Sequence, residues 1–152
     1  MPVSRVAPQP DLWPESTAIA DADYADAFVL TPMPSGDRSA EGWMRRALEG
    51  APMPLRWFVR FGWRFVLGFR SSRSGNILGW PIRASADEFV LMEQQSGLLE
   101  AALLLRTQPS GLRWETRVRY KAKTSVAVWV VVGLLHRRIV AHVLGRLPKH
   151  GS

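Results

Sequence analysis

Cysteine is absent from the chain and histidine is scarce. Without cysteine there can be no disulfide framework, thiolate metal site or cysteine nucleophile, which fits a reducing compartment such as the cytoplasm. The histidines are His136, His142 and His150. The first two would lie about 120° apart on a helix, so their spacing provides neither a shared metal site nor a proton relay. HExxH, GxSxG and glycine-rich phosphate motifs are also missing. We therefore predict no metal centre and no cofactor.

Long hydrophobic runs are missing as well. The longest charge-free apolar stretch, residues 124–135, is well short of the roughly 20 residues that a membrane-spanning helix requires. The first twenty residues contain four prolines and no continuous apolar run, so they do not read as a secretory signal. We predict an extended N-terminal arm over residues 1–20 and no transmembrane segment. We expect a cytoplasmic location and leave attachment to a membrane surface open.

The sequence does contain enough apolar material for one core. A hydrophobic fraction of 47% and seven tryptophans in 152 residues favour a single globular domain, because a chain of this length buries most of its apolar surface around one core. We place this domain at residues 21–148, followed by a tail at 149–152.

Positive charge is concentrated in the later part of the chain. Residues 1–50 carry a net charge of −4 and residues 51–152 a net charge of +11, and seventeen of the twenty basic residues are arginine. GC-rich coding bias produces such an excess more often than function does. The planar guanidinium also suits phosphate and carboxylate binding, so both interpretations stay open.

Hydrophobic periodicity predicts an α+β domain of order β-α-α-β-β-β-β-α. Residues 24–30 read as a first strand and 39–50 as a short helix, and four later strands form an antiparallel meander. Residues 112–122 alternate most regularly, with Arg113, Glu115 and Arg117 on the side that we expect solvent to wet. Residues 123–147 read as the last helix, with Thr124 or Ser125 as N-cap. The valine-rich run at 126–132 would also suit a strand.

A basic aromatic helix is predicted at residues 55–69. Arg56, Arg60 and Arg64 recur every four residues on one stripe, and aromatic side chains cover the opposite side. We favour a core helix whose arginines face solvent, because a two-layer domain needs an apolar face to cover its sheet. The alternative is an anion-binding or membrane-binding surface.

Nucleic acid is not an expected partner, despite a sequence pI of about 11.0. Strand alternation points Trp114 and Tyr120 away from the arginines of the same strand. These rings therefore cannot stack on bases that the arginines hold.

Carboxylates are the remaining catalytic candidates, and Glu93 and Glu100 are the best placed. Glu100 shares a strand face with apolar residues, and burial there would raise its pKa toward that of a general base. A register error in the predicted strand would explain the same pattern equally well.

Two motifs resemble a known family. They are Ala-Asp-Tyr-Ala-Asp-Ala-Phe at residues 22–28 and Leu-His-Arg-Arg-Ile-Val at residues 135–140, together with Gly79-Trp80. The chain resembles, over about residues 20–147, an uncharacterised bacterial family of the START-like (SRPBCC, helix-grip) superfamily, some of whose members are fused to short-chain dehydrogenase-like domains. The family often has proline where this chain has Leu134 and Ala141.

The resemblance implies a curved antiparallel sheet that grips a long C-terminal helix. It also implies an apolar cavity between the two, which in relatives holds lipids, sterols or polyketides. His136, Arg137 and Arg138 form a family motif that carries no assigned catalytic role. Three polar residues in mid-helix more often mark where a helix leaves the core for solvent.

We therefore expect a hydrophobic small molecule to bind between the sheet and the last helix. The expected lining residues are Trp80, Phe89, Leu91, Trp114, Val118, Trp129 and Gly133. The same aromatic side chains could instead fill the space. One alternative function is a cyclase- or hydrolase-type enzyme that uses this cavity with Glu93 or Glu100 as general base. The other is a peripheral membrane or partner-binding protein that uses residues 55–70.

Overall fold

The computed structural model describes residues 3–14, 17, 19, 21–34, 36, 38–61, 76–77 and 80–147. Its centre is an antiparallel sheet of seven strands in the order β1-β2-β7-β6-β5-β4-β3. The strands are β1 (Val3–Val6), β2 (Tyr24–Leu30), β3 (Asn76–Ile77), β4 (Trp80–Ser85), β5 (Phe89–Gln95), β6 (Leu99–Gln108) and β7 (Gly111–Tyr120). The helices are the short 3-10 helix η1 (Pro10–Leu12) and the α-helices α1 (Ala40–Leu48), α2 (Met53–Phe61) and α3 (Lys123–Gly145).

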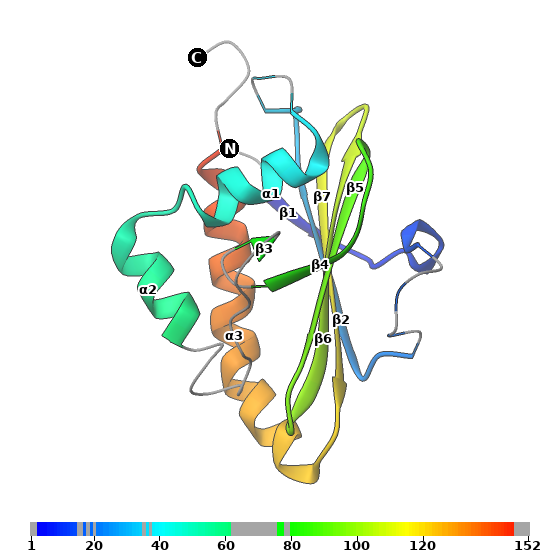
Figure 1. Ribbon diagram of the computed structural model, residues 1–152, viewed down its shortest axis with the longest axis vertical. Helices are drawn as coiled ribbons and strands as arrows, with labels where there is room; N and C mark the ends of the chain where they lie inside the picture. The colour runs from blue at the N-terminus through cyan, green and yellow to red at the C-terminus, as the bar shows by residue number, and fades with distance from the viewer. Residues whose placement is uncertain are drawn as a thin grey trace.

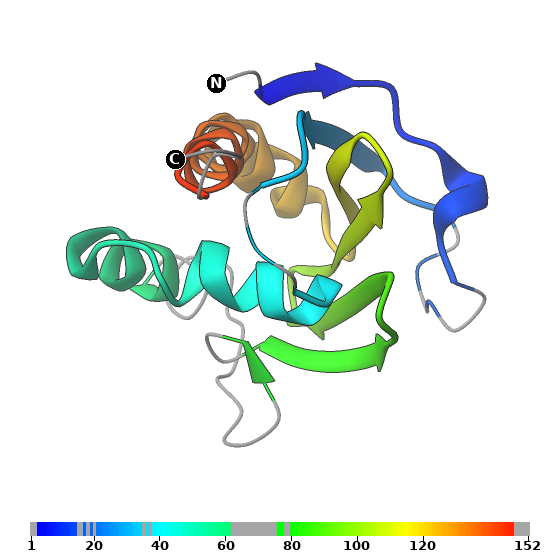
Figure 2. The same cartoon turned by 90° about the horizontal axis from the view of Figure 1, so that it is seen from above.

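The sheet separates two unequal layers. Helices α1, α2 and α3 lie on one side, and the segment between β1 and β2 crosses the other side (Figure 1). We call the side that carries the helices the inner face and the opposite side the outer face. From above, α3 lies beside β1, β2 and β7, whereas α1 lies over β5 and β6 (Figure 2). Helices α1 and α3 thus cover different parts of the inner face of the sheet.

The inner face carries the main apolar core. Alternation along β2 and β7 turns Phe28, Leu30, Trp114 and Val118 inward, where they join the buried residues of α1 and α3. A smaller apolar cluster lies on the outer face and contains Trp13, Ile19, Leu91, Ala102 and Leu104.

The predicted α+β class and C-terminal helix are confirmed, and the architecture is compatible with a helix grip. The order also matches from residue 24 onward, apart from the additional two-residue strand β3. The valine-rich run belongs to α3 and not to a strand. Trp129, Gly133, Val140 and Leu144 are all buried along one side of the helix, as its periodicity predicted, and Leu147 is buried just beyond its end at Gly145.

The predicted N-cap of the last helix is wrong, although its predicted start at Lys123 is correct. The N-cap is Ala122, which offers no side-chain cap, and the helix begins at Lys123. Ser125 lies inside the first turn, and its hydroxyl donates to the backbone carbonyl of Leu98. A tertiary hydrogen bond to the β5–β6 turn has replaced the local cap.

The predicted N-terminal arm is partly wrong. Val3–Val6 form β1 at the edge of the sheet, paired with β2, so the domain begins before residue 21. Farther along the arm, Trp13 and Ile19 are buried on the outer face. The arm is therefore a structural layer.

The predicted wet face of β7 is also wrong. Arg113, Glu115 and Arg117 do face outward, but each is at most 9% exposed. The N-terminal segment covers them and supplies hydrogen-bond partners, as when Arg117 donates to the carbonyl of Ile19 over 2.9 Å. Arg113 and Arg117 are therefore covered by the N-terminal segment and are not exposed to a nucleic acid.

Candidate functional site

A cluster of polar side chains lies inside the apolar inner layer, where α3 crosses the centre of the sheet. Tyr24 and Asp26 come from β2, Thr116 from β7, and His136 and Arg137 from α3. The register places Asp26 opposite Thr116, and both point inward by alternation. We call these five residues the polar cluster.

Hydrogen bonds link the members of the polar cluster. The hydroxyl of Tyr24 donates to Asp26 Oδ2 over 2.5 Å, and Arg137 Nη1 donates to the same hydroxyl over 3.1 Å. His136 Nε2 lies 3.4 Å from Asp26 Oδ2 and 3.1 Å from Thr116 Oγ1. The result is a continuous polar network between the sheet and α3.

Burial and hydrogen bonding have opposite effects on the Asp26 carboxyl. Burial alone would raise its pKa, because an apolar environment disfavours the charged form. The hydrogen bond and charge of His136, with further hydrogen bonds from Tyr24 and Thr116, outweigh burial and hold the pKa below its ordinary value. Asp26 is therefore a carboxylate at neutral pH, although it is only 1% exposed.

The pKa of the Tyr24 phenol shifts in the opposite direction to that of Asp26. Burial and the hydrogen bond to the Asp26 carboxylate raise the pKa of its phenol to about 12, although Arg137 acts against this. The phenol therefore stays protonated and remains a donor across the physiological range.

Two buried polar atoms beside this network have no hydrogen-bond partner. They are Asp26 Oδ1 and Trp129 Nε1. The Trp129 ring meets Tyr24 edge-on at 5.2 Å and lies 5.5 Å from the His136 ring, so it belongs to the same site. A side chain on Gly133 would come within 3.1 Å of Trp129 Nε1, so glycine leaves the room around this donor.

Five of the seven predicted lining residues lie on the inner side. Trp80, Trp114, Val118 and Trp129 belong to the main core, and Gly133 is buried beside Trp129. The other two predictions are wrong. Leu91 belongs to the outer cluster, and Phe89 packs against that cluster. The prediction took them from the wrong side of β5.

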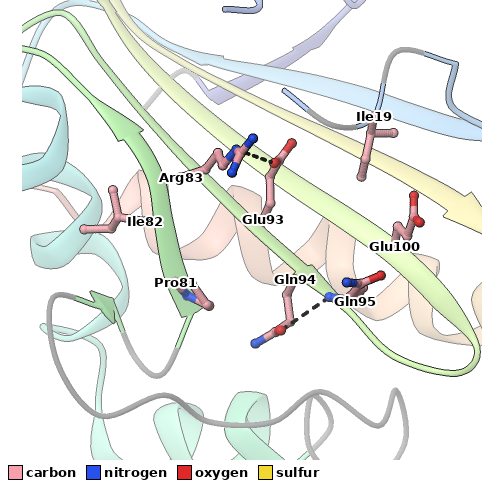
Figure 3. A pocket seen from close by; sticks show the side chains of 8 residues that line it. All are labelled: Ile19, Pro81, Ile82, Arg83, Glu93, Gln94, Gln95 and Glu100. Carbon is pink, nitrogen blue, oxygen red and sulfur yellow. Dashed lines mark hydrogen bonds and ion pairs between the residues drawn. The ribbon is translucent and has the colours of Figure 1, made fainter. Parts of the chain in front are cut away.

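The predicted catalytic carboxylates Glu93 and Glu100 line the same pocket beside β4 and β5 (Figure 3). The pocket has a volume of about 430 Å³ and is lined by Ile19, Pro81, Ile82, Arg83, Glu93, Gln94, Gln95 and Glu100. Glu93 accepts a hydrogen bond from Thr17 over 2.6 Å and lies 3.6 Å from Arg83 Nε. Glu100 pairs with Arg119 over 2.6 Å.

The sheet separates Glu93 and Glu100 from α3. Both residues lie on the outer side, on which Ala102 of β6 packs in the outer cluster. Neither can act as the base for a molecule held between the sheet and α3, so that part of the predicted enzyme is wrong.

The remaining predicted residues are placed unequally. Arg138 is exposed on α3, whereas His136 and Arg137 are half-buried in the polar cluster. The predicted polar exit of the helix into solvent therefore applies to Arg138 alone. Arg56 is half-buried on α2, and the Arg60 side chain and Arg64 lie outside the described residues.

One described helix, α3, is long and apolar enough to cross a membrane. Length and composition alone are weak evidence for a membrane span, because core helices of soluble proteins share them. No group of metal-binding side chains occurs among the residues that the structure describes.

The sequence prediction missed Tyr24, Asp26 and Thr116 as site residues. A signal for Asp26 was present, since it alternates onto the same strand face as Phe28 and Leu30, which are apolar. An acid on the apolar face of a strand indicates a buried polar site.

Comparison of the chain with models of known protein families, with curated proteins and with solved structures found no match.

Proposed function

We propose that the protein binds an apolar small molecule between the inner face of the sheet and α3, with the polar cluster as the recognition point. The observation that carries this proposal is the pair of buried, unpartnered atoms Asp26 Oδ1 and Trp129 Nε1 within an apolar layer. Binding sites for small molecules combine an apolar lining with a few convergent polar groups.

The unpartnered atoms specify what the ligand carries. Asp26 Oδ1 accepts a hydrogen bond, so it suits a hydroxyl or amide N–H, and Trp129 Nε1 donates one, so it suits a carbonyl or ether oxygen. A buried polar atom without a partner costs about 1–3 kcal/mol. A ligand that pairs with both atoms recovers this free energy on binding. The ligand class is therefore an apolar molecule with one hydroxylated or carbonyl-bearing end, such as a sterol, a fatty acid derivative or a polyketide.

The START-like resemblance supports the same proposal. Its two motifs are far apart in the sequence, yet Tyr24 and Asp26 of one contact Arg137 and His136 of the other. In a helix grip, the space between the sheet and the long helix is where relatives hold hydrophobic ligands.

A ligand panel tests the proposal. Sterols, neutral fatty acid derivatives and aromatic polyketides are screened by native mass spectrometry and by thermal melting. A ligand at about one hundred times its dissociation constant should stabilise the fold by about 2.7 kcal/mol, or roughly 5–10 °C in melting temperature.

Variants locate the binding site. We expect Asp26→Asn to weaken binding about tenfold or more, because a charged acceptor is lost. Trp129→Phe keeps the aromatic ring but removes the donor, so it tests the site where Asp26→Asn affects folding. Asp87→Asn, at an exposed turn, is the matched control. The proposal fails if no compound binds, or if Asp26→Asn and Trp129→Phe both bind as the wild type does.

The contact between His136 and Asp26 favours a second candidate, acid–base catalysis at the same cluster. A carboxylate that orients an imidazole is a common general-base arrangement. In a hydrolase-type reaction, His136 would then take the general-base role that the sequence predicted for Glu93 or Glu100. Hydrolysis of acyl esters by the wild type and its loss in His136→Gln would support this role, whereas equal rates in the two proteins would remove it.

A further inference from the structure

The outer side of α3 is apolar and exposed along its first half. Five side chains on this side are between 42 and 63% exposed, namely Val126, Val130, Val131, Leu134 and Leu135. At about 100° per residue they occupy one half of the helix circumference, opposite the buried Trp129. We call these five residues the apolar stripe.

The ionisable side chains that adjoin the apolar stripe on this helix are all basic. Lys123 precedes it, and Arg138, His142 and Arg146 continue it toward the C-terminus, all exposed. The helix contains no acidic residue. The outer side of α3 therefore combines an apolar centre with positive ends.

Pairing with a second copy of the chain does not suit this pattern. An antiparallel contact centred between Val130 and Val131, the two most exposed residues of the stripe, would place Lys123 of one copy opposite Arg138 of the other. No acid on the helix would neutralise this repulsion.

We propose that α3 docks on an anionic lipid surface through the apolar stripe. The valines and leucines would enter the boundary between headgroups and acyl chains, while Lys123 and Arg138 would meet lipid phosphates. Charge complementarity favours this occupant, because an anionic membrane attracts the same side chains that repel a second copy.

The helix lies along the membrane and does not cross it. Its inner side, with Trp129, Val140 and Leu144, is buried against the sheet. Insertion across the bilayer would strip this side from the core. Met53 and Trp57 on α2 are also exposed, and α2 lies on the same side of the sheet as α3 (Figure 1). This docking is independent of the proposed ligand site.

Vesicle sedimentation tests the proposal. The full chain is mixed with vesicles of phosphatidylcholine alone or with one quarter phosphatidylglycerol, at about 50 mM and about 0.5 M salt. We expect binding to the anionic vesicles at low salt, with at least a tenfold loss at high salt, since exposed charges are screened.

Three variants separate the contributions. Val130→Gln/Val131→Gln should reduce binding about tenfold or more without unfolding, because both side chains are exposed and glutamine is a good helix former. Lys123→Gln/Arg138→Gln should reduce it roughly thirtyfold, at about fivefold per basic residue. Arg5→Gln/Arg46→Gln removes two exposed charges elsewhere and is the matched control.

Several results would overturn the proposal. One is equal binding to neutral and anionic vesicles. Another is wild-type binding by both Val130→Gln/Val131→Gln and Lys123→Gln/Arg138→Gln. A third is a dimer in light scattering that Val130→Gln/Val131→Gln dissociates, because the stripe would then be a protein interface.

Discussion

Asp26 shows how the fold keeps a charge inside its core. Its carboxylate is buried among apolar residues of the inner face, and Tyr24, Thr116 and His136 supply the interactions that keep it ionised. A buried polar network of this kind requires every partner, since a lone charge in the core would be expensive. The same network leaves Asp26 Oδ1 without a hydrogen-bond partner.

The lowered pKa of Asp26 makes stability depend on pH in acid. Its folded pKa lies below the unfolded value of about 3.9, so Asp26 contributes stability that is complete above that value and is lost as the pH falls through the folded pKa. We expect Asp26→Asn to flatten this acid limb in urea unfolding measured from neutral pH down to about pH 2. Asp87→Asn should leave it intact. An unchanged acid limb in Asp26→Asn would contradict the lowered pKa.

Tyrosine ionisation gives a second, spectroscopic prediction. The chain has only two tyrosines, and burial raises the pKa of both Tyr24, to about 12, and Tyr120. Because the folded pKa of Tyr24 is raised, its contribution to stability is complete below about pH 10 and is lost as the pH rises through about 12.

Absorbance at tyrosinate wavelengths should therefore show a late transition near pH 12 that Tyr24→Phe removes and Tyr120→Phe retains. If Tyr24→Phe leaves the transition near pH 12 in place, the pKa of Tyr24 is not raised by burial and by Asp26 as described.

Sequence could identify the strand that carries Asp26 but not its site. Alternation along residues 24–30 placed Asp26 on the correct side of β2. Its importance depends on α3 crossing at that point, more than a hundred residues later in the chain, with His136 turned toward the sheet. Periodicity reports which side of an element a residue occupies and gives no information on which distant element meets it.

The segment between β1 and β2 is held to the sheet by buried charge. Glu115 on β7 accepts hydrogen bonds from Trp13 Nε1 over 2.9 Å and from Arg113 Nε over 2.6 Å, and the backbone N–H of Gln9 also donates to it. The Arg117 guanidinium lies over the Trp13 ring at 4.2 Å. The segment and the strand therefore depend on each other for their polar partners.

We expect Glu115→Gln to lower the free energy of unfolding by about 3–5 kcal/mol, because it leaves Arg113 buried without its charge partner. Glu100→Gln breaks the more exposed pair with Arg119 and should cost about 0–1 kcal/mol, which makes it the matched control. Urea unfolding measures both.

Replacing the pair together, by Arg113→Met/Glu115→Leu, should cost less than Glu115→Gln alone, since no unpaired charge remains. Similar losses for Glu115→Gln and Glu100→Gln would contradict the buried network.

Helix α3 was predictable as an element and in its start at Lys123, although its N-cap was not. The valine run favoured a strand locally, but one continuous apolar side from Trp129 to Leu147 favoured a helix, and packing decided in favour of the helix. The N-cap prediction failed because the Ser125 hydroxyl found the Leu98 carbonyl, a partner that no local rule could reveal.

At the level of the whole molecule, the inner layer was easier to predict than the outer one. The inner layer is built from long amphipathic elements, whose apolar sides are visible in the sequence. The outer layer depends on a proline-rich segment with little periodicity, and its packing comes from single residues such as Trp13 and Ile19. Without that layer, Arg113 and Glu115 alternate as ordinary surface charges. Because the outer layer was not predicted, Leu91 was assigned to the inner side of β5, although it packs on the outer side.

The two proposed functions use opposite sides of α3, which permits a test on the whole molecule. His136 faces the sheet, whereas Val130 and Val131 face outward. We expect Val130→Gln/Val131→Gln to lose vesicle binding but to keep the ligand-dependent rise in melting temperature. Asp26→Asn should lose that rise and keep vesicle binding, because additivity holds for sites that share no partners. If either variant loses both properties, the two sides of α3 are coupled, and the ligand would then enter from the lipid surface on which the helix rests.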